Sequence, residues 1–545
     1  MGFIADYRSQ QNTKRELKKQ KLEEDLQKSR AKTAALKAQT DAINNYMNSG
    51  YSHGGASHSQ TWSEKYLSSS YSAKSDIEEN RKTLRERTRD LYMNAPLGTA
   101  AINTTRTNVV GAGLIPKPKL DYEFLGISQE ESARLQQKIK KEFALWAGST
   151  LCDSNDQNNF YELQQIAFSD WLKNGEEFAL IKYADETPYM PYQLRLKLIE
   201  ADRVCSPGSF DGEYSGIDKK ADNGNRIMNG LEIDPSGKVV AYYISSKFPG
   251  EYGEFGKQEW QRIEKRGKLT GNPNILHMFS AERAEQYRGV PFLAPVIHII
   301  KQMTRYTEAE VMAAVVNSMF TVFVTTESGD DVEFGGVDDI DQAPDYGTSD
   351  DDRFKMGTGT VNFLKEGEKI EPVQSTHPSG NYDSFIQTMA MQVGSALEIS
   401  PEVLLKKFSN NFSASKGAVN ETWKSFMMRR KWFVNDFCQE VYELWFSEAV
   451  AKGRINAPGY FLDPMIRKAY TACNWIGTAQ GYLNPQAEVN AAILRINNGL
   501  STHEDECAAI NGSDFEENMR TLSGEVKKIN EVYKDNYDGG QNDED

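Results

Sequence analysis

The sequence predicts a multi-domain α+β protein, and three observations support this prediction. The first is a set of short runs of alternating apolar residues, separated by Gly, Asn and Asp clusters as in an antiparallel sheet, at 176–183, 194–200, 230–234, 238–245 and 275–279. The second is a pair of long helical patterns, at 292–319 and 416–452. The third is a length of 545 residues with 39% hydrophobic side chains, enough for about two to four domains and a buried core.

Residues 1–75 predict an N-terminal charged helical arm followed by a flexible linker. Between 14 and 47, a few leucines are scattered among many Lys, Glu and Gln residues, too sparsely for a stable coiled coil by itself. We therefore expect this helix to order only against a partner. Residues 48–75 are rich in Ser, Gly and Tyr, as in a linker.

The remaining elements follow in order along the chain. Before the strands, helical patterns occupy 77–94, 100–110, 128–147 and 158–174. After the 292–319 helix come a strand candidate at 321–326, a strongly acidic stretch at 329–352, strand character at 360–373 and a second helix at 382–399. The 416–452 helix has an apolar face that only Arg430 interrupts: Val419, Trp423, Phe426, Phe433, Phe437, Val441 and Leu444. The last residues, 531–545, predict a disordered acidic tail.

Targeting signals and metal ligands are not evident in the sequence. No run of about 18 apolar residues predicts a membrane span, and the first residues lack the apolar segment of a secretory signal. Five scattered cysteines without a C-x-x-C pair favour reduced thiols in a cytoplasm over disulfides or zinc. The acidic stretch does not fit the EF-hand register, so we expect no metal and no cofactor.

The charge balance bears on nucleic-acid binding. The net charge is -15 at pH 7, whereas ordinary nucleic-acid binding needs a positive surface. This composition is still compatible with a protein that lets DNA pass without adhering to it. The acidic balance therefore disfavours sequence-specific DNA recognition and leaves non-specific passage open.

Catalytic motifs are nearly absent. The phosphate-binding G-x-x-x-x-G-K-[ST] loop, the dinucleotide-binding G-x-G-x-x-G and the G-x-S-x-G nucleophile elbow do not occur. Ser413 and Lys416 fit the loose S-x-x-K pattern, but its usual partner motifs are missing. We expect an assembly protein and not an enzyme, and two alternatives stay open: a serine hydrolase or acyl-transfer enzyme using Ser413 and Lys416, and an assembly scaffold without a channel.

A series of short motifs takes the interpretation further. They include R-x-x-D-L-x-x-N at 87–94, NVVGAGLIP at 108–116, WLKNGEEF at 171–178, RGVPFLAP at 288–295 and NNGLST at 497–502. In this order, and over about residues 80–525, the chain resembles the lambda-family portal proteins of tailed phages. It departs from the family in its long N-terminal arm, in Lys416 where Arg is usual, and in the acidic 329–352 stretch.

The resemblance implies a closed ring, usually of twelve subunits, at one vertex of the capsid. Double-stranded DNA would pass through the ring without sequence specificity during packaging and ejection. The implied partners are the terminase large subunit, head–tail adaptor proteins and the major capsid or scaffolding protein, with no membrane. The protein would be found in the virion and, during assembly, in the host cytoplasm.

The resemblance also divides the chain into the parts of a portal subunit. After the 1–75 arm it implies a wing at 76–291, stem helices at 292–319 and 382–399, a clip at 320–381 between them, a tunnel loop at 400–416, a long upper-wing helix at 417–454, a crown at 455–530 and the tail at 531–545.

Three sets of site residues follow from this division. In the tunnel loop, residues that touch DNA phosphates without reading sequence would be Lys406, Lys407, Asn410, Asn411, Ser413, Ser415 and Lys416. In the clip, residues that dock the motor and adaptor would be Asp330, Asp331, Asp338, Asp339, Asp341, Asp350, Asp351 and Asp352. On the first stem helix, small residues that pack subunits would be Ala309, Ala313, Ala314 and Ser318. Pairing of the lysines with acids between subunits, and an ordinary buried face for the small residues, remain open.

Overall fold

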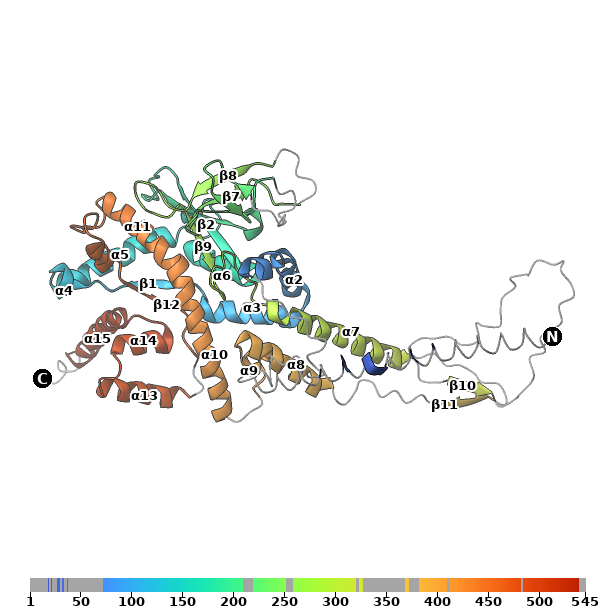
Figure 1. Cartoon of the computed structure of the whole chain (residues 1–545). Coiled ribbons are helices and arrows are strands. Elements are labelled where there is room, and N and C mark those ends of the chain that lie inside the picture. The colour runs from blue at the N-terminus through green and yellow to red at the C-terminus, as the bar shows by residue number, and fades with distance from the viewer. Residues whose placement is uncertain are drawn as a thin grey trace, which may run out of the picture. The chain divides into compact units, whose positions relative to one another are not determined.

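The computed structural model describes residues 72–208, 219–250, 258–319, 323–326, 368–371, 382–408, 412–481 and 484–538, together with residues 18, 21, 27–29, 32, 33 and 37. The chain divides into two units, Met1–Ser72 and Ala73–Asp545. The eight described residues before Ser72 are helical and exposed. The second unit is coloured from blue to red in Figure 1. None of the described helices is long and apolar enough to cross a membrane.

Two antiparallel sheets form the strand-rich part of the second unit, which agrees with the α+β prediction. The first has the order β3-β2-β9, with β2 (Glu176–Tyr183) between β3 (Leu194–Ile199) and β9 (Ile275–Phe279). The second follows chain order: β4 (Lys219–Lys220), β5 (Arg226–Met228), β6 (Leu231–Ile233), β7 (Val239–Ser245) and β8 (Trp260–Glu264). All five predicted strands are present. β4, β5 and β8 were not predicted, because they are short and lack clear alternation.

Capping residues account for the boundaries of the helices beside these sheets. These helices are α2 (Arg81–Asn94), α3 (Pro96–Val109), α4 (Tyr122–Leu125), α5 (Gln129–Ala147) and α6 (Phe160–Asn174). Ser128 with Glu131, and Asn159 with Glu162, form capping boxes at the starts of α5 and α6. Gly175 ends α6 at φ 85°, where a Cβ would lie 2.4 Å from the carbonyl carbon of Val290.

The long predicted helix is two helices joined by a π-helical turn. α10 (Phe412–Phe433) leads through Val434–Cys438 into α11 (Gln439–Ala451). Most of the predicted apolar face is buried, but Val419 and Trp423 are only half-buried. The extra residue in the π turn shifts the face by about a quarter turn without ending the helix.

One apolar core joins helices that are far apart in the sequence. Phe143 of α5 lies 5.0 Å from the Trp445 ring of α11 and 5.8 Å from the Phe160 ring of α6. These three side chains are 0–1% exposed. β1 (Ile115–Pro118) also pairs with β12 (Cys473–Ile476) across the chain. Segments of the predicted wing and upper wing therefore share one core, while their boundaries stay a prediction.

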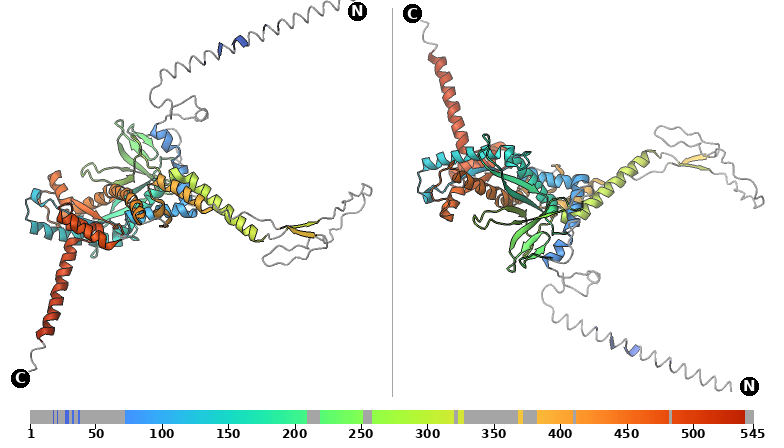
Figure 2. Two further views of the ribbon diagram at one scale, coloured as in Figure 1. Left: turned by 90° about the horizontal axis from the view of Figure 1, so that it is seen from below. Right: turned by 90° about the horizontal axis from the view of Figure 1, so that it is seen from above.

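The C-terminal part is helical. It contains α12 (Pro464–Thr471), α13 (Pro485–Asn497), α14 (His503–Asn511) and α15 (Phe515–Asp538). α15 extends into the segment 531–545 that the sequence predicts to be a disordered tail, because the helical apolar spacing continues past Ile529 to Val532 and Tyr533. Figure 2 shows α15 leaving the neighbouring helices as a single rod.

Candidate functional site

The predicted stem helices lie side by side. They are α7 (Ile297–Met319), which a 3₁₀ turn at Ala294–Val296 precedes, and α8 (Tyr382–Leu397). Tyr306 of α7 stacks on Tyr382 of α8 with ring centroids 5.8 Å apart, and the Tyr382 hydroxyl donates to Thr307 Oγ1 at 3.3 Å. Outward from them, β10 (Phe323–Thr326) pairs antiparallel with β11 (Glu368–Glu371), as the strand predictions at 321–326 and 360–373 suggest.

The predicted packing residues of α7 differ in exposure. Ala309 is exposed, Ala313 and Ala314 are half-buried, and the side chain of Ser318 lies outside the described residues. Beside them, the apolar side chains of Val311, Met312 and Val315 are 44–64% exposed. Ala309 is therefore not part of a helix face buried within this chain, and its role between subunits stays a prediction.

The connection after α8 is held by α10. Glu398 has a left-handed backbone with φ 57°, and its carbonyl accepts a hydrogen bond from Ser425 Oγ at 3.0 Å. The Ser400 N–H donates to Thr422 Oγ1 at 2.9 Å. These contacts fix the start of α9 (Pro401–Leu405), which lies inside the predicted loop 400–416.

The predicted tunnel loop is therefore shorter than the sequence suggested. α9 ends at Lys406 in the left-handed conformation, φ 54°, and α10 already begins at Phe412. Lys406, Lys407 and Phe408 are exposed, while Asn410 and Asn411 lie outside the described residues. Only residues 406–411 separate the two helices.

The other predicted loop residues have different surroundings. Lys407 Nζ is 3.6 Å from Asp383 Oδ1 on α8, and Lys416 forms an ion pair with Glu488 on α13. Ser413 is exposed, whereas Ser415 is buried and its hydroxyl has no hydrogen-bond partner among the described residues. Lys407 and Lys416 therefore have acidic partners within this chain, and pairing between subunits stays a prediction.

The eight predicted docking residues of the clip, Asp330 to Asp352, all lie outside the described residues. Their role stays a prediction.

The enzyme alternative gains no support from Ser413 and Lys416. A serine nucleophile needs a base in contact with its hydroxyl. The Lys416 ammonium instead contacts the Glu488 carboxylate. Within the part of the chain that the structure describes, no group of three or more His, Cys, Asp or Glu side chains could hold a metal ion.

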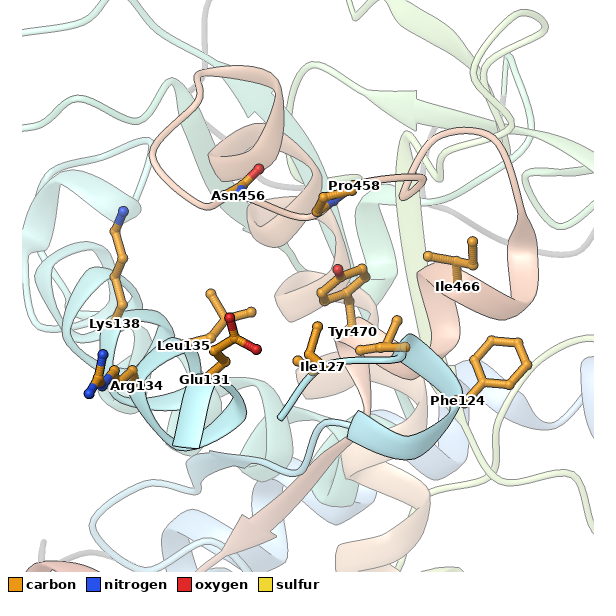
Figure 3. A pocket seen from close by; sticks show the side chains of 11 residues that line it. Phe124, Ile127, Glu131, Arg134, Leu135, Lys138, Asn456, Pro458, Ile466 and Tyr470 are labelled. Carbon is orange, nitrogen blue, oxygen red and sulfur yellow. The ribbon is translucent and has the colours of Figure 1, made fainter. Parts of the chain in front are cut away.

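A surface pocket of about 490 Å³ lies between α4–α5 and the 456–470 segment (Figure 3). Arg134 and Lys138 stand on its α5 side, and Phe124 and Ile466 stand opposite. Its lining has a single carboxylate, Glu131, and no Ser, Thr, Cys or His. It therefore lacks a serine, threonine or cysteine nucleophile with a histidine base.

A buried charge cluster centred on Glu176 was not predicted. Glu176 is fully buried and accepts hydrogen bonds from Arg288 Nε at 2.7–2.8 Å, from Arg85 at 2.8 Å and from the Gly289 N–H at 3.2 Å. Burial alone would raise the pKa of Glu176, but Arg288 and His277 hold it well below its ordinary value. Glu176 and Arg288 lie in the motifs WLKNGEEF and RGVPFLAP, but neither motif indicates that the two side chains pair. The cluster fastens α2 and the 286–291 segment to β2.

Arg430, which interrupts the apolar face of the long helix, is a second buried cation with a structural role. Its guanidinium donates to the carbonyls of Asn108 and Val109 at the end of α3, and to that of Thr478, at 2.7–2.8 Å. The carbonyls of Asn108 and Val109 lie in the last turn of α3, where the helix itself supplies no donor. Burial lowers the pKa of Arg430 to about 10. Arg430 thus joins α10 to α3 and to the segment after β12.

Comparisons with known proteins place this architecture in a family. The chain matches the family described as "Phage portal protein, lambda family" over residues 60–430. It is 23% identical over 445 residues to the portal protein of Escherichia phage N15, which covers 78% of this chain and 81% of that protein. It is 22% identical over 448 residues to portal protein B of Escherichia phage lambda, which covers 78% and 80%. A chain of the virion of a native gene transfer agent particle aligns with 80% of this chain and 94% of its own length, at 11% identity and a TM-score of 0.39.

Proposed function

The chain belongs to the lambda family of phage portal proteins, and we propose that it forms the ring through which double-stranded DNA enters and leaves a phage capsid. The observation that carries this proposal is the family match, which extends from before α2 into α10 and so includes the stem helices and the segment between α9 and α10. The ring would stand at the portal vertex of the virion, after assembly in the host cytoplasm.

Subunit packing in the ring would use the open face of α7. Val311, Met312 and Val315 are apolar and exposed in the single chain, and Ala309 beside them permits close approach of a neighbouring helix. A head-to-tail interface repeated around an axis buries such a face on every copy. We take twelve as the number of subunits, as is usual in this family.

The DNA contact would come from the turn between α9 and α10. Lys406 and Lys407 are exposed there, and the Lys407–Asp383 pair is itself solvent-exposed, so a phosphate can replace the carboxylate at little cost. Twelve copies with a net charge of -15 each repel phosphate elsewhere. The lysines would thus hold DNA locally without reading its sequence.

The remaining parts would contact other assembly proteins. The β10–β11 strand pair and the acidic residues beyond it would form the clip, which docks the terminase large subunit during packaging and the head–tail adaptor afterwards. The wing would contact the major capsid or scaffolding protein.

Charge reversal in the turn tests the DNA contact. Lys406→Glu/Lys407→Glu should leave ring assembly intact and reduce the yield of DNA-filled particles by about tenfold, because attraction for phosphate becomes repulsion. The matched control is Lys138→Glu/Lys141→Glu, an equal charge change at exposed positions of α5. Filled particles at the control's yield would remove this turn from the DNA path.

A further inference from the structure

Residues 484–538, which hold α13, α14 and α15 and which we name the C-terminal helices, stand outside the apolar core of residues 73–480, which we name the body. In the described chain that core includes no residue after Trp475. The C-terminal helices are nevertheless joined to one another. Arg495 of α13 contacts the Glu506 carboxylate of α14 at 2.6–2.7 Å, and His503 stacks on Phe515 with ring centroids 5.1 Å apart.

Ion pairs join the C-terminal helices to the body. Lys117 Nζ of β1 lies 2.9 Å from Glu504 Oε1 and 3.6 Å from Asp514 Oδ2. Lys140 of α5 contacts Asp514 at 2.7 Å, and Lys416 of α10 contacts Glu488. In each of these pairs the cation belongs to the body and the carboxylate to the C-terminal helices. The two surfaces are therefore complementary in charge.

The packing beside the Lys416–Glu488 pair is hollow and mostly polar. A cavity of about 350 Å³ lies between α10 and the C-terminal helices, and six of its ten lining residues are polar or charged: Lys416, Asn420, Gln480, Glu488, Arg495 and Glu506. The chain segment that leads into the cavity is held at Thr478 by Arg430. A Cβ added at Gly481, three residues further on, would have no neighbouring atom within 4 Å. The connection can therefore turn near Gly481.

We propose that the C-terminal helices are a movable module that an ionic latch, made of Lys117, Lys140 and Lys416 with their carboxylate partners, fastens to the body. The side chains of the latch are 11–42% exposed, so salt reaches and screens them. Apolar burial, which holds the body together, is not weakened in this way. Opening the latch therefore releases the C-terminal helices while the body stays folded. This movement of the C-terminal helices is a property that the proposed channel function does not include.

Amide hydrogen exchange of the assembled protein tests the latch, with α14 as the reporter. α14 has nine residues and is too short to stay helical when released. Raising NaCl from about 50 mM to about 500 mM should speed exchange in α14 about tenfold and leave α6 unchanged. Lys117→Met/Lys140→Met should speed α14 exchange at low salt to a similar extent, because these changes remove two of the cations.

The control variant is Arg454→Met, which removes an ion pair of similar exposure between Glu142 of α5 and the turn that follows α11. Its α14 exchange should match that of the unaltered protein. If α14 exchange changes by less than twofold with both salt and Lys117→Met/Lys140→Met, the latch is refuted. Light scattering of the same samples reports ring assembly separately, so failure of the ring and failure of the latch can be told apart.

Discussion

The body and the C-terminal helices are held in place by different forces. In the body, Phe143, Phe160 and Trp445 are almost completely buried and bring α5, α6 and α11 together. The C-terminal helices reach the same body through lysine–carboxylate pairs that water still reaches. Apolar burial stabilises in proportion to area and resists salt, whereas exposed ion pairs contribute little each and are screened. The comparison therefore predicts that the C-terminal helices can move relative to a rigid body.

The largest expected effect comes from the aromatic core. Trp445→Ala should lower the free energy of unfolding by about 3–5 kcal/mol, because a fully buried ring is lost and a cavity remains. Trp432→Ala removes the same side chain from an exposed position of α10 and should cost under about 1 kcal/mol. Denaturant unfolding of both variants measures the difference. Equal midpoints would show that Trp445 is not part of a tightly packed core.

A smaller effect should follow at the buried cation Arg430 within the body. Arg430→Met leaves three carbonyls without their donor and should cost about 2 kcal/mol. Arg429→Met, one position earlier, removes an ion pair with the half-exposed Glu398 and should cost less. If thermal unfolding ranks the two variants in the opposite order, Arg430 does not hold α10 to α3.

The smallest effect on global stability should come from the latch itself. Lys117→Met/Lys140→Met should change the unfolding free energy of the body by less than about 1 kcal/mol, although it loosens α14. The same denaturant experiment measures this change. A loss as large as that of Trp445→Ala would mean that the C-terminal helices are part of the main folding unit, and the contrast between the two regions would disappear.

Much of the fold was predictable because its signals are local. The 3.6-residue spacing located α5, α6 and the long α10–α11 helix, and alternation located β2 and β7. α9 was taken for loop, although Ser400-Pro401-Glu402 is a recognisable helix start with proline in the first turn.

Contacts between distant residues were beyond sequence reasoning. Arg288 meets Glu176 across 112 positions, and Lys416 meets Glu488 across 72. Neither pair has a local pattern, because only the folded backbone brings the two side chains together. For the same reason Arg430 could be recognised as an interruption of an apolar face but not as the donor to α3. Lys406 and Lys407, which are exposed, were predicted from the family resemblance and not from spacing, and their contact with DNA stays a prediction.

The most direct test of the central claim, that this chain forms a ring with a channel, is the mass and the top-view image of the purified protein. Native light scattering with negative-stain microscopy gives both. Twelve chains of 61.4 kDa should form a particle of about 740 kDa with a central hole. A compact monomer or dimer at every concentration and salt, and also when the capsid proteins are present, would contradict the claim.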